Sequence, residues 1–268
     1  MKHLLVTCMI FSTMGGSLFS QDDPPAKKSS IRLAGGMAIV DYQDLVFSES
    51  IYEGSGLGSI ELGYHWSHRR SAINAQLSYT ATSVAPENLI SSEAFGQREE
   101  SSFLQVALDL NYAYQVIDVS GFRGYAGVNL QAKYQENTMV FGLGEESSYA
   151  YLNTLGPHVM LFYSLPEGWE LQGRLSLPLA AFLARPEYAV VDNGDIQGKE
   201  GFGLLYSKGQ LVSLGDYTAI DLSAKLSHGI SRRLTGFLAY QFEYQNISIP
   251  APMHLQTSTV KLGIECQL

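Results

Sequence analysis

The chain is poor in three features that would place it among disulfide-linked, nucleic-acid-binding or helical membrane proteins. It has two cysteines, and only Cys266 lies beyond the first twenty residues, so an internal disulfide after that segment is excluded. Acidic residues outnumber basic ones 26 to 17, and the net charge of −9 argues against nucleic acid as a partner. Beyond residue 20 no stretch approaches the roughly 20 continuous apolar residues that a membrane-spanning helix needs.

The first twenty residues have the pattern of a secretion signal. Lys2 and His3 form a short polar start, and residues 4–11 are mostly apolar. This apolar run is too short for a spanning helix, and small residues lead to a predicted cleavage after Ser20. We expect a signal peptide over 1–20, a short periplasmic segment over 21–30 and an outer-membrane domain over 31–268.

A two-residue alternation recurs along the chain and is clear over residues 102–115. The even positions from 104 to 114 read Leu, Val, Leu, Leu, Tyr and Tyr, while the odd positions are mostly polar or small. Successive side chains of a β-strand point to opposite faces, so this pattern indicates strands with one apolar face. A mean hydropathy of 0.00 fits such strands, because their two faces cancel. With a secretion signal in front, the pattern predicts a transmembrane β-barrel in the bacterial outer membrane.

The alternation and its interruptions predict ten antiparallel strands. The strands are expected near 31–41, 57–66, 71–83, 101–116, 122–136, 155–165, 169–183, 216–228, 233–246 and 256–268. Short connections are expected at 67–70, 117–121, 166–168 and 229–232, and long ones at about 42–56, 84–100, 137–154, 184–215 and 247–255. Short periplasmic turns alternating with long outer loops are typical of transmembrane barrels. A soluble β-sandwich, the alternative, gives no reason for this sorting.

Aromatic residues gather at both ends of the predicted outward faces. Those near short turns are Tyr64, Trp66, Tyr112, Tyr114, Phe122, Tyr163 and Trp169, and those near long loops are Tyr79, Tyr134, Phe242 and Tyr244. Aromatic rings favour the two levels of the lipid headgroups, so we expect these residues to mark both membrane surfaces.

The last strand resembles the C-terminal signal that the bacterial barrel-assembly machinery reads. Residues 261–268 alternate and contain Gly263, although the chain ends on Leu268 instead of the usual aromatic residue. The resemblance implies this machinery as a partner during biogenesis. Outer-membrane lipid and lipopolysaccharide would then surround the folded protein.

The predicted inward faces hold six basic and six acidic residues. They are Arg32, Arg123, Lys133, Arg174, Lys225 and Lys261, with Glu61, Asp109, Glu170, Asp221, Glu243 and Glu265. Unpaired charges are costly in a narrow lumen, so we expect ion pairs that fill it. Folding about the 247–255 connection predicts a Glu243–Lys261 pair, and closure of the barrel predicts an Arg32–Glu265 pair. The alternative interpretation of these charges is an ion path.

The predicted outer loops carry thirteen acidic and four basic residues, an excess that could attract cationic ligands or divalent ions. A plain solvated surface is the other interpretation. The loop residues that could take part in a reaction are His158, Asp192, Asp195, Glu200 and His254, because a histidine beside a carboxylate can act as a general base. The histidines lack metal-ligand spacing, and no phosphate-binding glycine motif is present, so we predict no catalytic residues, metal or cofactor.

Segments 156–177 and 217–244 resemble strands of the omptin proteases in their placement of tyrosine and glycine around tight turns. The resemblance implies the ten-strand layout that omptins share with the Opc-type adhesin. Omptins also carry an Asp-x-Asp and an Asp-x-His element in their outer loops. Here 84–100 has no aspartate, and no histidine follows Asp192 and Asp195 within 184–215. The omptin catalytic residues are therefore not carried over.

The sequence thus predicts an outer-membrane barrel with a surface-binding, adhesin-like or structural role that depends on its acidic outer loops and an extracellular ligand. A small pore for ions or solutes is the first alternative. An omptin-like protease or a lipid-modifying enzyme is the second.

Overall fold

The structure, a computed structural model, describes residues 28–46, 48–86, 101–141, 144–185, 190–191 and 209–268. The strands of the barrel wall are β1 (Lys28–Asp44), β2 (Tyr52–His68), β3 (Ser71–Pro86), β4 (Ser101–Val119), β5 (Phe122–Phe141), β6 (Gly144–Ser164), β7 (Trp169–Ser176), β11 (Tyr217–Gly229), β12 (Leu234–Ile247) and β13 (Met253–Gln267). The shorter elements are η1 (Pro166–Gly168), β8 (Ala180–Ala184), β9 (Val190–Val191) and β10 (Gln210–Ser213).

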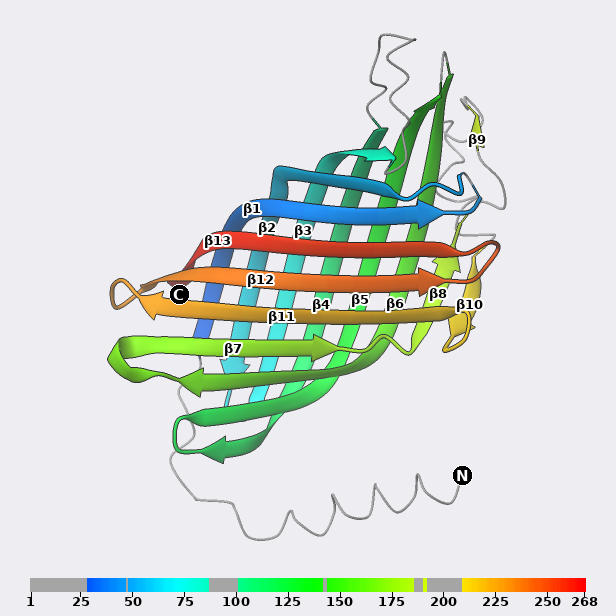
Figure 1. The fold of residues 1–268 in the computed structure, drawn as a ribbon. Coiled ribbons are helices and arrows are strands. Elements are labelled where there is room, and N and C mark those ends of the chain that lie inside the picture. The colour runs from blue at the N-terminus through cyan, green and yellow to red at the C-terminus, as the bar shows by residue number, and fades with distance from the viewer. Residues whose placement is uncertain (1–27, 47, 87–100, 142–143, 186–189, 192–208) are drawn as a thin grey trace, which may run out of the picture.

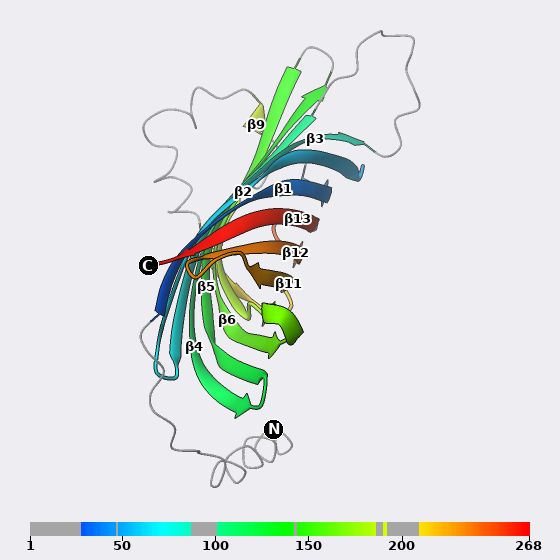
Figure 2. The ribbon, with the colours of Figure 1, turned by 90° about the vertical axis from the view of Figure 1, so that its left-hand side faces the viewer.

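The ten wall strands close into a ring, each antiparallel to both neighbours. Consecutive strands pair from β1 to β7, then β7 pairs with β11, and the series continues through β12 and β13 back to β1 (Figures 1 and 2). The predicted fold class, a ten-stranded antiparallel barrel, is confirmed. Because every edge is paired, the wall leaves no backbone groups of the sheet exposed to lipid.

Strands reach further at the outer end than the sequence predicts. The predicted 137–154 loop is wrong, because β5 and β6 pair as far as Phe141 and Gly144 and leave only 142–143 between them. The predicted 42–56 loop is wrong in the same way, since β1 runs to Asp44 and β2 starts at Tyr52. Beyond the membrane an outward side chain need not be apolar, so the alternation fades while backbone pairing continues.

Part of the predicted 184–215 loop is also a hairpin. Beyond Pro178, the strand that begins as β7 resumes as β8, which pairs with β6 on one side and with β10 on the other. Leu177 and Leu179 donate backbone hydrogen bonds to Pro157 and Leu155, so the wall stays paired around the proline, which has no N–H. Residues 186–189 and 192–208 of this segment lie outside the described residues.

The outer surface of the wall is apolar, and this surface marks the membrane-spanning part. Large apolar side chains such as Leu62, Leu108, Leu130 and Leu161 point outward and are at least 41% exposed. Tyr64, Tyr112, Tyr114, Tyr163 and Trp169 are also exposed toward the end with the short turns. An exposed apolar band of this extent is the face that lipid covers.

No described helix has the length and apolar character to cross a membrane.

The first described strand, β1, begins at Lys28, three residues before the first predicted strand. The predicted signal peptide over 1–20 and most of the 21–30 segment lie outside the described residues.

Candidate functional site

The lumen is the part of the barrel where charged side chains from all sides of the wall converge. All twelve predicted lumen charges lie on the inward-facing alternation of their strands. The ion pairs among them are Arg32–Glu61, Lys261–Glu61, Lys133–Glu243, Lys225–Glu265 and Arg123–Glu170. Asp109 instead accepts hydrogen bonds from the amides of Asn129 and Gln131, at 3.4 and 2.9 Å. Within the described part of the chain, Arg174 and Asp221 form no ion pair.

Of the two predicted pairs, Arg32 and Glu265 lie opposite each other as expected, whereas Glu243 and Lys261 do not. Arg32 lies directly opposite Glu265, although its ion pair is with Glu61, at 2.8 Å from Nε to Oε1. Glu243 lies opposite Thr257, four residues along β13 from Lys261, and pairs with Lys133. Pairing starts with Ile247 opposite Met253, which centres the β12–β13 turn on residue 250, whereas a Glu243–Lys261 pair requires a centre at residue 252.

Contacts across the lumen define its outer half. Lys133 on β5 pairs with Glu243 on β12, and Gln105 on β4 donates to the same carboxylate at 3.1 Å. Gln135 and Gln245 hydrogen-bond one another at 3.3 Å. In the ring β4 and β5 stand opposite β12, so these side chains bridge the lumen.

Above these bridges, the outer half is filled by an apolar cluster. Its members are Val40, Tyr42, Tyr52, Val84, Phe103, Ala150, Leu152, Ala181, Leu183, Val212, Tyr217, Ala219, Ile247, Met253 and Leu255. A buried ion pair of Arg185 with Asp44 borders the cluster, and Tyr42 and Ser148 donate to the same aspartate at 2.8 and 2.9 Å. The sequence placed Asp44 and Arg185 in exposed loops, which is wrong. The alternation of β1 continues to Asp44 and was the signal for its inward position.

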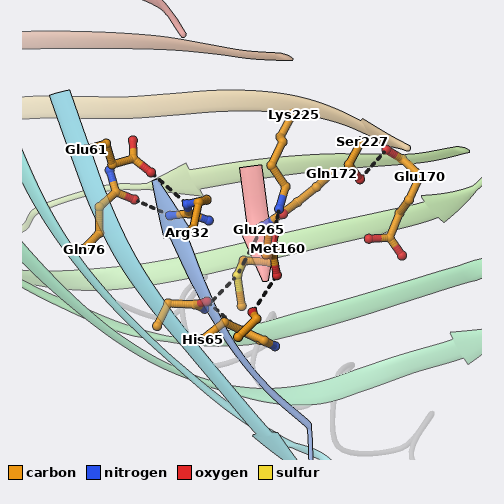
Figure 3. Close-up of polar contacts among 12 residues, drawn as sticks. Arg32, Glu61, His65, Gln76, Met160, Glu170, Gln172, Lys225, Ser227 and Glu265 are labelled. Atoms are coloured by element: carbon orange, nitrogen blue, oxygen red, sulfur yellow. Dashed lines mark hydrogen bonds and ion pairs between the residues drawn. The ribbon is translucent and has the colours of Figure 1, made fainter. Parts of the chain in front are cut away.

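The periplasmic half of the lumen has a different character. It contains a cavity of about 50 Å³, lined by the charged residues Arg32, Arg174, Lys225, Lys261 and Glu61, and by amide side chains including Gln76. Figure 3 shows Arg32 directed at Glu61 and Gln76, with Lys225 meeting Glu265 nearby.

Exposure rises toward the periplasmic end. The side chains of Lys133 and Glu243 are 1% and 5% exposed, Lys225 and Glu265 15% and 20%, and Arg123 and Glu170 40% and 33%. The periplasmic half therefore reaches solvent from the side of the short turns, whereas the outer half is closed.

Of the five loop candidates, the structure describes His158 and His254, and it places these two in different surroundings. His158 was predicted near the mouth, but it is buried inside the lumen, where its Nδ1 lies 2.9 Å from Ser176 Oγ. It lies this deep because β6 begins at Gly144 and not near residue 155. Ser176 lies between His158 and Asp221 in the register, so the histidine does not link nucleophile to acid as a Ser-His-Asp triad requires.

His254 faces outward on β13 with Gln43 and Asn246 as register partners. Asp192, Asp195 and Glu200 lie outside the described residues. Among the residues that are described, no three potential metal ligands of the His, Cys, Asp or Glu type come together.

No protein-family model matches the chain. No curated protein matches it by sequence. Among solved structures it is similar to the outer-membrane protease OmpT from Escherichia coli, with a TM-score of 0.59 and 10% identity over 94% of this chain and 100% of that one. It also aligns with the translocator domain of the autotransporter NalP from Neisseria meningitidis, with a TM-score of 0.43 and 8% identity over 98% and 95% of the two chains.

The OmpT likeness supports the fold and not the activity. Together, the closed ten-strand ring, the exposed apolar band and this likeness define a bacterial outer-membrane β-barrel.

Proposed function

We propose that the protein is a non-conducting outer-membrane barrel that binds a cationic ligand or surface through its outer connections. The observation that carries the proposal is the set of bridges across the lumen, above all Lys133 and Gln105 meeting Glu243 from the opposite wall. A lumen crossed at this level and filled above by an apolar cluster offers no route for solutes, which leaves the outer surface as the place for recognition.

The charge of the outer connections supports a cationic partner. Asp44 and Arg185 neutralise one another inside the barrel. Without these two residues, the sequence of the predicted outer loops still contains twelve acids and three bases. Of these, Glu49 and Glu53 are exposed at the described outer end. A surface dominated by one sign of charge raises the local concentration of oppositely charged partners and speeds their association.

Binding to an immobilised lysine polymer tests this proposal. The full chain, in nanodiscs of uncharged lipid, is compared with a variant carrying Glu187→Gln, Asp192→Asn, Asp195→Asn and Glu200→Gln. We expect about tenfold weaker binding for the variant, and weaker binding of the parent protein as salt increases. The control is Asp118→Asn with Glu167→Gln, which removes exposed acids at the periplasmic turns and should leave binding unchanged. Equal binding by all three proteins would contradict the proposal.

Planar bilayers distinguish the proposal from a pore. The folded protein should give no discrete conductance steps, since its lumen is bridged. Regular steps from the parent protein would favour the pore instead.

A further inference from the structure

We propose that the periplasmic half of the lumen binds a small oxyanion, such as inorganic phosphate, which enters from the periplasm and is held by Arg174. The site is the cavity lined by Arg32, Arg174, Lys225, Lys261 and Glu61. It goes beyond the proposed function, because it faces the opposite side of the membrane.

Positive charge predominates around the cavity. Four cationic side chains line it, against one lining carboxylate, Glu61, which is already shared by Arg32 and Lys261. Lys225 has its own partner in Glu265. Within the described part of the chain two carboxylates therefore face four cations, and the partly buried guanidinium of Arg174 has no carboxylate partner.

Arg174 itself is poorly hydrogen-bonded. Among the described residues its Nη1 reaches only Gln76 Oε1, at 3.5 Å, and its Nε is buried without a hydrogen-bond partner. A guanidinium offers five donors in a planar fork that matches the oxygens of a carboxylate or phosphate. Leaving such donors unsatisfied in a buried site is costly, and an oxyanion would satisfy them.

Amide donors beside the cavity are also weakly satisfied. Asn74 Nδ2 and Gln172 Nε2 both point at the sulfur of Met160, at 3.5 and 3.9 Å, as Figure 3 shows for Gln172 and Met160. A thioether is a weak acceptor, so these amides have little to lose by turning to an oxygen. They add neutral donors to the cationic ones, as an oxyanion with several acceptor atoms requires.

The missing negative charge lies further along the lumen, at and next to the level of the bridges. There Asp109, Asp221 and Glu243 face one cation, Lys133, and Asp221 lies directly opposite Glu243 in the register. One oxygen of Asp221 is buried without a partner among the described residues. Arg174 and Asp221 are not within ion-pair distance. The lumen is thus balanced in total and polarised along its axis, and a mobile anion would balance the periplasmic half.

The dimensions and access of the cavity agree with a small ligand. About 50 Å³ accommodates roughly three or four water-sized groups, which suits phosphate or a short carboxylate better than a longer sugar acid. Entry is from the periplasm, because the side chains become more exposed in that direction and the outer half is closed.

Isothermal titration calorimetry with sodium phosphate tests the site on the full chain in zwitterionic micelles, against sodium gluconate at equal ionic strength as the oversized anion. We expect saturable phosphate binding, no gluconate binding, and at least about tenfold weaker phosphate binding for Arg174→Gln. Arg174→Lys should be intermediate, because it keeps the charge and loses the fork. Arg123→Gln is the matched control, since it removes a lumen cation outside the cavity, and should bind as the parent does.

A second variant keeps the test decisive where Arg174→Gln fails to fold. Ser223→Leu fills the cavity and leaves every charge in place, so it should abolish binding in a folded barrel. The absence of phosphate binding by the parent protein would overturn the proposal. Undiminished binding by Ser223→Leu or by folded Arg174→Gln would overturn it as well, and sodium chloride competing as well as phosphate would replace the oxyanion with a halide.

Discussion

The outer and periplasmic halves of the lumen are built from the same ten strands, yet they handle charge in opposite ways. In the outer half Lys133 and Glu243 are almost wholly buried and reach each other across the barrel. In the periplasmic half Arg123 on β5 and Glu170 on β7 form an ion pair along one side of the wall and remain well exposed. An equal number of positive and negative charges therefore does not by itself close a lumen. Closure comes from side chains that meet across the lumen and from the apolar cluster above them.

The largest expected effect comes from breaking the bridge in the outer half. Lys133→Met leaves Glu243 as a buried carboxylate without its cation, which should lower the free energy of unfolding by about 3–5 kcal/mol. Urea titration of the protein folded into lipid vesicles measures this change.

The double variant Lys133→Met with Glu243→Leu is the control for that bridge. Replacing both charges by apolar groups should recover most of the loss, to within about 1 kcal/mol of the parent. A single variant as stable as the parent would show that the bridge is not a buried pair.

Thinning the apolar cluster should have the next largest effect. Leu152 is fully buried within it, so Leu152→Ala should cost about 2–5 kcal/mol through lost burial and the cavity left behind. The same titration applies, with Leu155→Ala on the outward face of β6 as the control. Equal losses from the two variants would argue that the cluster is not a packed core.

The smallest effect is expected in the periplasmic half. Arg123 and Glu170 lie 2.5 Å apart but are 40% and 33% exposed, and ion pairs open to solvent contribute little. Arg123→Gln should therefore change the unfolding free energy by less than about 1 kcal/mol. A loss as large as that of Lys133→Met would remove the contrast between the two halves.

Strand number, closure and the inward direction of the twelve lumen charges could be predicted from the sequence. These properties follow from the two-residue period alone, because lipid demands apolar residues on one face. The same rule explains the failures at the outer end. Around residues 137–154 the strands leave the lipid, the apolar face is no longer required, and the predicted loop is in fact paired strand.

Which lumen charges pair could not be predicted. The alternation says that Glu243 and Lys133 both point inward, but not that strands far apart in the ring bring them together. That depends on barrel tilt and on the register, and a turn centre placed two residues too far along the chain gave Glu243 the wrong partner. The inward position of Arg185 had no periodic signal, since Arg185 lies one residue beyond the end of β8, within the predicted 184–215 loop.

The most direct test of the contrast between the two halves is thiol accessibility inside the folded barrel. In a chain with Cys8 and Cys266 both replaced by serine, Ser223→Cys places a thiol at the periplasmic cavity and Ala107→Cys places one beside Lys133. A small water-soluble thiol reagent should modify Ser223→Cys in the folded protein, and Ala107→Cys only after unfolding. Comparable modification of both in the folded barrel would contradict a lumen that is closed on its outer side and open to the periplasm.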